Sequence, residues 1–264
     1  MDQDITLTLQ EVRDELGEYP DPVLEELDRA MNVMPSALSE SQVAQWAASG
    51  LDMAGQTVRS WEAATQYYRV SPIVLGYMPF NYFLKWAGCG SSLCRESPTL
   101  AAAYFEASPG TMGKLRSRHI ESWAGLGRSL YRGTWKSSTL ACKFFASSPD
   151  LLETLTFPEL ERFVGFLGVL SHRSHDLSAE CLVLSQRIFP LLQGDKAPFV
   201  ALASDMAQSG WREVKSFLES ATKALPRIQS DERLRFLKIA ERLVDAGGLN
   251  IPTAMLDISQ SMTR

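Results

Sequence analysis

The chain has 264 residues, of which 45% are hydrophobic and 22% are charged, and its formal net charge is −5. This composition supplies enough apolar side chain for an ordered core and excludes a long disordered polar protein. No run approaches the roughly 20 apolar residues of a membrane-spanning helix, and acidic residues stand at the start, where a signal peptide needs basic ones. We therefore expect a cytosolic protein with one continuous domain.

The first 34 residues are expected to form an N-terminal helical cap. The stretch ITLTLQEV alternates for a few residues as a strand would, and DELGEYP after it reads as a turn. An acidic amphipathic helix then follows, with Pro22 in its first turn after Asp21. Because a repeat array needs a terminal element with a polar outer face, residues 1–34 are suited to close one end of such an array.

Three later stretches are near copies of one another: SWEAATQYYRVSP, SPTLAAAYFEASP and SSTLACKFFASSP. Each contains small residues, an aromatic pair and a closing Ser-Pro, and the prolines Pro72, Pro109 and Pro149 are 37 and 40 residues apart. A fixed period of this size predicts tandem units that bury their apolar faces by stacking. Because proline disfavours helical geometry at the preceding residue, we predict that Ser-Pro ends the second helix of each unit.

A second motif, WAxxG, marks the first half of each unit. Its tryptophans are Trp46, Trp86 and Trp123, and each is followed four positions later by a glycine. Phe163 takes the same place 40 residues after Trp123, and Pro190, Pro226 and the segment around Phe236 continue the period. Apolar residues recur at steps of three and four, which indicates helices. We predict that the four rings occupy equivalent buried positions and that the glycines let a neighbouring helix approach closely.

Residues 35–264 are therefore predicted to be an all-α array of tandem helical-hairpin repeats, with a period of about 37–41 residues. The expected arrangement is a HEAT/TPR-like right-handed α-α superhelix of about five hairpins. The sequence leaves open whether the chain is a piece of a longer protein. Such arrays present surfaces to other molecules, so we expect neither an enzyme nor a cofactor. The four cysteines form no CxxC pair and are expected to be structural thiols.

Charge is distributed unevenly along the chain. Residues 1–60 carry a balance of −9, whereas residues 110–145 carry +6. The connector SLYRGTWKSSTL lies in this basic region and combines aromatic residues with arginine, the composition of binding hot spots. We predict a turn with Gly133 ending one helix and Thr134 or Ser137 capping the next. The candidate partner-binding residues are Arg116, Arg118, Tyr131, Arg132, Trp135 and Lys136. A solvated face without a partner is the alternative interpretation.

Two segments contain residue types that bind metal ions elsewhere. His172, His175, Asp176 and Glu180 cluster in one segment, but that segment falls where a polar connector between two helices is expected, so we predict no metal there. Near the C-terminus, the order Asp257, Ser259, Ser261 is similar to the first metal-binding loop of von Willebrand factor A domains. Pro252 makes the preceding residues a poor central strand, and the repeat period favours a helix instead.

The tandem motifs resemble a known family. WAxxG, LYRGTWKSSTLACKFFASSP and FPELERF are similar to the long helical region that precedes the von Willebrand factor A domain in bacterial NorD-like proteins, over residues 38–220. The resemblance implies a helical scaffold that works with a MoxR-type AAA+ ATPase or its client. In that family the A domain carries the metal site; this chain lacks a complete A domain, so metal-dependent binding is not carried over.

Two functions from different classes follow. The first is a noncatalytic scaffold that binds a partner protein on its concave or basic surface. The alternative is a nucleic-acid-binding helical-repeat protein, which the basic middle of the chain supports and its acidic start opposes. No membrane partner is expected.

Overall fold

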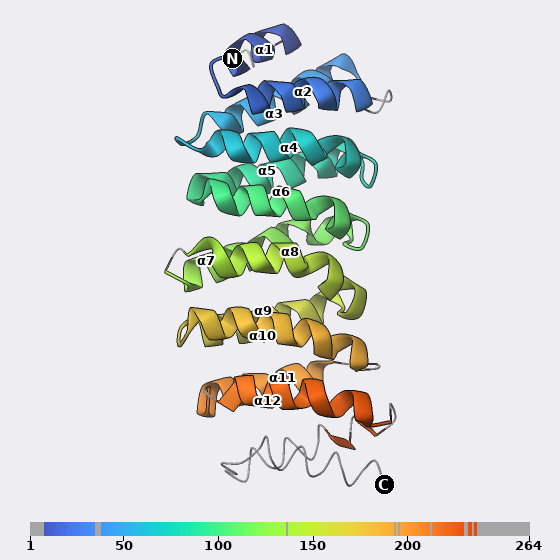
Figure 1. The fold of residues 1–264 in the computed structure, drawn as a ribbon. Coiled ribbons are helices and arrows are strands. Elements are labelled where there is room, and N and C mark those ends of the chain that lie inside the picture. Colours follow the sequence, from blue (N-terminus) through green and yellow to red (C-terminus); the bar gives the residue numbers. More distant parts are fainter. Residues whose placement is uncertain are drawn as a thin grey trace. The chain divides into compact units, whose positions relative to one another are not determined.

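The computed structural model describes residues 8–34, 38–135, 137–192, 194, 196–211, 213–229, 232–233 and 235–236. Every element of secondary structure in this part of the chain is a helix, so the all-α prediction is confirmed (Figure 1). The helices form two compact units, Met1–Arg128 and Ser129–Arg264. Across the described residues, every helix is too short or too polar to traverse a bilayer.

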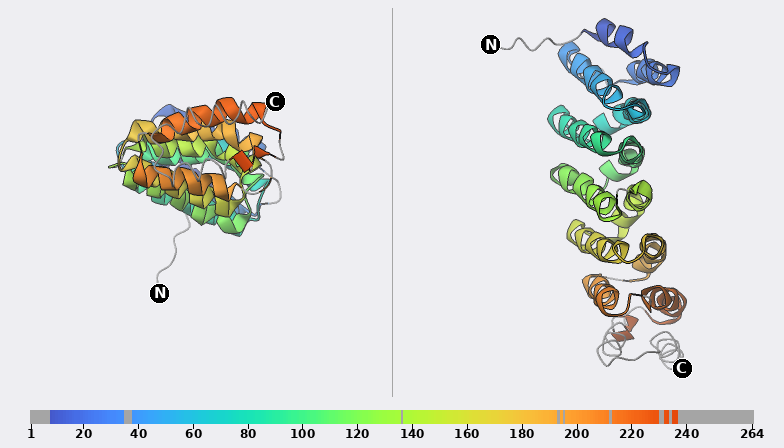
Figure 2. Two further views of the ribbon diagram at one scale, coloured as in Figure 1. Left: turned by 90° about the horizontal axis from the view of Figure 1, so that it is seen from below. Right: turned by 90° about the vertical axis from the view of Figure 1, so that its left-hand side faces the viewer.

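The described part of the first unit contains six complete α-helices. They are α1 (Leu9–Leu16), α2 (Asp21–Val33), α3 (Glu40–Ala54), α4 (Ser60–Leu75), α5 (Phe80–Glu96) and α6 (Pro98–Met112). The helices pack in two rows: α1 contacts α3 and α3 contacts α5, while α2 contacts α4 and α4 contacts α6. Figure 2 shows these two rows in the right-hand view. A short 3₁₀ turn (η1, Ser117–His119) leads into α7 (Ile120–Gly133), which contains the boundary between the units.

The second unit repeats this scheme of contacts. Its helices are α8 (Ser138–Thr154), α9 (Phe157–Ser171), α10 (His175–Ile188), α11 (Ala197–Ser209) and α12 (Glu213–Ala224), with 3₁₀ turns η2 (Phe189–Leu191) and η3 (Leu225–Arg227). One row is formed by α8, α10 and α12, and α9 contacts α11 in the other. In both units, therefore, each of these rows is built from alternate helices along the chain.

Helix starts are fixed by capping residues. Ser39 caps α3 as part of a capping box in which the Gln42 side chain also reaches back to the Ser39 backbone, and α2 carries Pro22 in its first turn. The sequence analysis did not predict α1, because the alternation of ITLTLQEV concealed a second capping box. In it, the Glu11 carboxylate accepts a hydrogen bond from the Thr8 backbone N–H at 2.6 Å, and the Thr8 hydroxyl accepts one from the Glu11 N–H.

The motif tryptophans lie in the core. Trp46, Trp86, Trp123 and Phe163 are all buried, as predicted. In the first unit, the tyrosine that opens each aromatic pair connects two of these residues. The Tyr67 hydroxyl donates to the Trp46 carbonyl at 3.1 Å while its ring stacks on Trp86, with centroids 5.6 Å apart. Tyr104 repeats this contact one step later: its hydroxyl donates to the Trp86 carbonyl at 3.2 Å and its ring packs on Trp123 at 4.8 Å.

The glycines of the WAxxG motif make room for the second ring of each aromatic pair. A Cβ atom on Gly50 would lie 2.2 Å from Cζ of Tyr68, and one on Gly90 would lie 1.9 Å from Cζ of Phe105. Both distances are far below van der Waals contact, so an alanine fits at neither position unless the ring moves. The predicted close approach at these two glycines is confirmed.

The prediction that Ser-Pro ends a helix is wrong. Pro72, Pro109 and Pro149 lie inside α4, α6 and α8, which continue to Leu75, Met112 and Thr154. In each case the preceding serine donates its hydroxyl to the carbonyl four residues earlier, at 2.7 Å for Ser108 to Tyr104 and 2.8 Å for Ser148 to Phe144; Ser71 bonds Tyr67 in the same way. A serine bonded in this way and a following proline bend a helix without ending it.

Candidate interaction site

The predicted site residues fall into two groups. Arg116 and Arg118 are exposed in the connector between α6 and α7, where the Arg118 Nε donates to the His119 Nε2 at 3.1 Å. Arg132 lies in the last turn of α7 and Trp135 follows that helix. Most of α7 separates the two groups along the chain, and each group belongs to a different unit. Lys136 lies outside the described residues.

Tyr131 does not belong to a surface. It is only 6% exposed, so its prediction as a partner-binding residue is wrong. The helix α7 extends to Gly133, which places Tyr131 in the helix, next to Leu130 on its buried side, rather than in the connector. The connector proper is therefore the tight turn from Thr134 to Ser137.

Hydrogen bonds join Thr134 to Ser137 and to the end of α7. The Ser137 N–H donates to the Thr134 carbonyl at 2.9 Å, which closes a four-residue turn. Thr134 is buried, and its hydroxyl lies 3.0 Å from the Tyr131 carbonyl and 2.7 Å from the Ser137 carbonyl. As predicted, Gly133 ends α7 and Ser137 occupies the N-cap of α8, although the Ser137 side chain does not cap the helix.

Trp135 occupies the second position of the turn in an unusual conformation. Its φ is 54°, the left-handed region, and it is the one described residue other than glycine with a positive φ. Its side chain is 86% exposed. A bulky residue with positive φ costs of order 1 kcal/mol relative to glycine. The fold therefore holds a large aromatic ring in water at a position where glycine would be more stable.

A groove of about 360 Å³ lies next to this turn in the second unit. Thr134 and Ser137 contribute from the turn, and the first two turns of α8 and of α10 form its walls. The remaining lining residues are Thr139, Leu140, Lys143, His175, Asp176, Ala179 and Glu180. The floor is partly apolar and the rim is polar, which is typical of a small binding groove.

The charges along the groove are only partly compensated. Glu180 pairs with Lys215 on α12 at 2.8 Å, and this hydrogen bond raises the pKa of Lys215. Behind them, burial raises the pKa of the Cys181 thiol to about 12, which keeps it protonated and unreactive at neutral pH. The Nδ1 atom of His175 is buried and has no hydrogen-bond partner among the described residues.

Only part of the histidine segment forms the expected connector: His172 to Ser174 join α9 to α10, whereas His175, Asp176 and Glu180 lie in α10. His172 ends α9, and Ser174 caps α10 by accepting a hydrogen bond from the Leu177 N–H at 3.3 Å. Within the part of the chain that the structure describes, no three histidine, cysteine or acidic side chains are grouped so that they could hold a metal ion. Asp257, Ser259 and Ser261 lie outside that part.

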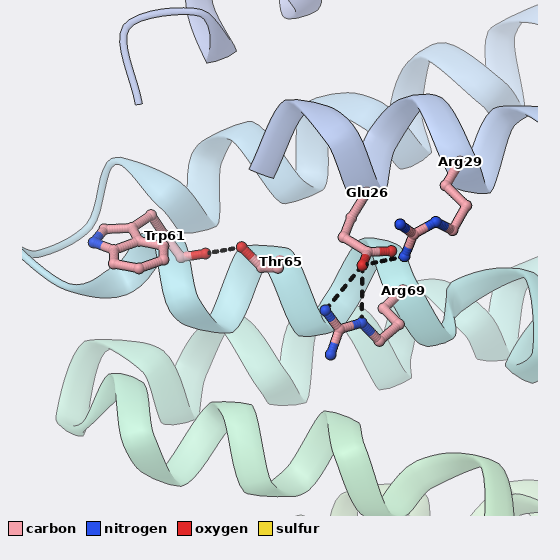
Figure 3. Close-up of polar contacts among 5 residues, drawn as sticks. All are labelled: Glu26, Arg29, Trp61, Thr65 and Arg69. Carbon is pink, nitrogen blue, oxygen red and sulfur yellow. Dashed lines mark hydrogen bonds and ion pairs between the residues drawn. The ribbon is translucent and has the colours of Figure 1, made fainter. Parts of the chain in front are cut away.

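A polar cluster that the sequence analysis missed joins α2 to α4 in the first unit (Figure 3). The Glu26 carboxylate is 5% exposed, and its Oε1 accepts from Arg29 Nη1 at 2.6 Å and from Arg69 Nε and Nη2 at 3.0 and 2.9 Å. On α4, the helix that carries Arg69, the Thr65 hydroxyl donates to the Trp61 carbonyl at 2.8 Å. Both arginines are substantially exposed, so solvent screens the pairs. We interpret the cluster as a contact between helices, because Oε1 of Glu26 binds both arginines; its Oε2 is buried without a hydrogen-bond partner among the described residues.

Comparison with known proteins adds no relative: no family model, no curated protein and no solved structure matches the chain. The site therefore rests on geometry alone. Of its residues, the sequence indicated Trp135 and Arg132, whereas Lys143 was noted only as part of the basic region. The groove itself could not have been found, because residues 37 positions apart line it.

Proposed function

We propose that the chain is a noncatalytic helical-repeat scaffold that binds a partner protein at the turn Thr134–Ser137. The observation that carries this proposal is Trp135, whose ring is exposed on a backbone conformation that favours glycine. Tryptophan is the residue type most enriched among energetic hot spots of protein interfaces. Arg132, exposed in the last turn of the preceding helix, adds a second residue of that kind.

We also propose that the recurring helix contacts belong to tandem hairpin repeats in a right-handed superhelix. The tyrosine bridges from Tyr67 and Tyr104 and the glycine contacts at Gly50 and Gly90 support a repeated unit. Small-angle X-ray scattering of the whole chain tests this arrangement. A superhelix of stacked repeats gives one rigid elongated particle, whereas two units that reorient freely give a scattering curve that only an ensemble fits.

The partner is tested by affinity capture from native lysate after chemical cross-linking. The parent is compared with Trp135→Gly, which fits the positive φ and keeps the turn intact. The matched control is Tyr77→Ala, which removes an exposed aromatic ring from the first unit. We expect Trp135→Gly to lose one or more proteins that the parent and Tyr77→Ala retain.

The resemblance to NorD-like proteins makes a MoxR-type AAA+ ATPase the first partner to look for in the captured set. Capture that is identical for the parent and for Trp135→Gly would contradict the proposed site. Capture that disappears on treatment with nuclease would instead support the nucleic-acid-binding alternative.

A further inference from the structure

One wall of the groove beside Trp135, the side formed by α8, carries a positive charge. Lys143 is exposed on the α8 wall and forms no ion pair with any described residue. Arg173 is also exposed and lies in the connector between α9 and α10. That connector lies against the end of α7, because a Cβ on Gly133 would be 3.5 Å from the Ser171 Oγ. Lys143 and Arg173 therefore lie close to the turn that carries Trp135.

The acidic residues of the groove oppose this charge only on one side. Asp176 and Glu180 belong to α10, and the Glu180 carboxylate is already paired with Lys215. The α8 wall carries no acidic residue among those that line the groove. The groove is therefore positive on its α8 side and negative on its α10 side. An anionic group is favoured along α8 and disfavoured beside Asp176.

Hydrogen-bond donors on the α8 side reinforce this direction. The Ser137 hydroxyl is directed to the Thr139 Oγ1 at 3.5 Å and does not cap α8. The first N–H groups of a helix without such a cap carry partial positive charge and need acceptors. Together with the Lys143 ammonium, they favour a carboxylate as the occupant of this wall.

We propose that the groove binds an acidic linear segment of a partner protein. An aspartate or glutamate of the segment lies along α8 near Lys143, and an apolar side chain of the segment packs against the Trp135 ring. Leu140 and Ala179 provide the apolar floor between them. This inference rests on the proposed function, because it names the chemistry of the partner at the same site.

The test is selection of a displayed library of random 12-residue peptides on the whole folded chain. We expect the enriched peptides to contain Asp or Glu next to an apolar residue. Synthetic versions should bind Trp135→Gly about 30-fold more weakly than the parent, the loss typical of a hot-spot aromatic residue. Binding to Lys143→Glu should be about tenfold weaker, mainly through a slower association rate at low salt, because Lys143 is exposed.

Charge reversal provides the sharper control. A second selection on Lys143→Glu should enrich peptides with Lys or Arg in place of the acidic residue. Lys223→Glu, in the last turn of α12, changes the net charge equally in the same unit and should leave the original acidic preference intact. A role for Lys143 in stability alone would produce no such exchange of preference.

Two outcomes overturn the proposal. Enrichment of peptides without excess acidic residues, or of none at all, would show that the groove does not take an acidic segment. Peptides that bind Trp135→Gly as tightly as the parent would place the contact elsewhere. Either result leaves the proposed function standing if Trp135→Gly still loses a captured protein, because a folded partner surface could then replace the linear segment. The two failures are thereby distinguishable.

Discussion

The helix pairs α3/α4 and α5/α6 are built on the same sequence pattern, but they satisfy their buried polar groups differently. In α5/α6, the Trp86 Nε1–H donates to the Ser108 hydroxyl at 2.8 Å. In α3/α4, Trp46 Nε1 is buried without an acceptor among the described residues. The second ring of the aromatic pair compensates: Tyr68 donates its hydroxyl to the Ala47 carbonyl at 2.6 Å, whereas Phe105 has no hydroxyl to donate.

This difference shows which part of the pattern the fold requires. Both pairs keep the ring against glycine and the first tyrosine on the tryptophan carbonyl, so the shape of the contact is the same in each. The remaining cross-helix hydrogen bond comes from tyrosine in one pair and from tryptophan in the other. Packing shape is therefore shared between the pairs, while the donor of this bond is exchangeable.

The largest effect is expected from removal of the tryptophan rings. Trp86→Ala should lower the free energy of unfolding of the first unit by about 3–5 kcal/mol, because it leaves a cavity in the core. Trp46→Ala should cost about 1 kcal/mol less, since it also removes a buried N–H without an acceptor. Urea unfolding followed by far-ultraviolet circular dichroism measures both. Equal losses would mean that the Trp86 hydrogen bond contributes nothing.

The next effect concerns the glycine that receives the aromatic ring. Gly90→Ala should cost about 1–3 kcal/mol, because the new methyl group overlaps the Phe105 ring. Gly88→Ala is the matched control on the same helix: Gly88 is exposed and a Cβ there meets no atom within 4 Å. The control should stabilise the unit by about 1 kcal/mol through helix propensity. If both changes stabilise, the ring does not lie on Gly90.

The difference between the two helix pairs is tested most directly at Ser71 in α4 and Ser108 in α6. Ser108→Ala should cost about 1–3 kcal/mol, because the Trp86 N–H then remains buried without an acceptor. Ser71→Ala removes only a bond to the carbonyl one turn earlier and should change the free energy of unfolding by less than about 0.5 kcal/mol. Trp86→Phe should make Ser108→Ala nearly neutral in a double-mutant cycle. A cycle without coupling would refute the bond.

The smallest effect is expected at Cys89, whose place in the motif is taken by Ser49 in α3. Ser49 donates to the Gln45 carbonyl at 2.8 Å, and Cys89→Ser can make the same contact within α5. The change should alter the free energy of unfolding by less than about 0.5 kcal/mol at pH 7.

Alkaline pH distinguishes the Cys89→Ser variant from the parent. Burial, followed by the nearby Glu121 carboxylate, raises the pKa of Cys89 from 9.0 to about 11. The folded state therefore binds this proton more tightly than the unfolded state, and its contribution is lost as pH rises from 9 toward 11. Thermal melts across that range should show a steeper loss for the parent than for Cys89→Ser. Parallel losses would mean that the thiol titrates normally.

The sequence predicted the parts of the fold that follow from periodicity. Spacing alone identified the helices around Trp46, Trp86 and Trp123 and placed these rings in the core. It failed at α1, where eight residues form a helix because Thr8 and Glu11 cap it and α3 packs on it. The prediction failed again at Pro72. The tendency of proline to end a helix is weaker there than the packing of α4 against α2 and α6.

The candidate site was harder to predict, for a physical reason. Charge density pointed to the region that contains the turn at Trp135 but also included Arg116 and Arg118, which belong to a different connector. Whether Tyr131 or Trp135 faces water depends on where α7 ends, and boundaries depend on local hydrogen bonds such as those of Thr134. Glu26 escaped notice because its partner Arg69 is 43 positions away, on another helix.

The contrast between Trp135 and the core tryptophans gives the protein two optical reporters. Three indoles are sealed from solvent, so their emission is blue-shifted and inaccessible to iodide or acrylamide until the first unit unfolds. The indole of Trp135 emits from water and is quenched freely. Trp61 and Trp211 are partly exposed, so the signal of Trp135 is the difference between the spectra of the parent and of Trp135→Gly. Resistance of that difference to iodide reports occupation of the turn, and a shift of the blue emission reports melting of the first unit, without an added dye.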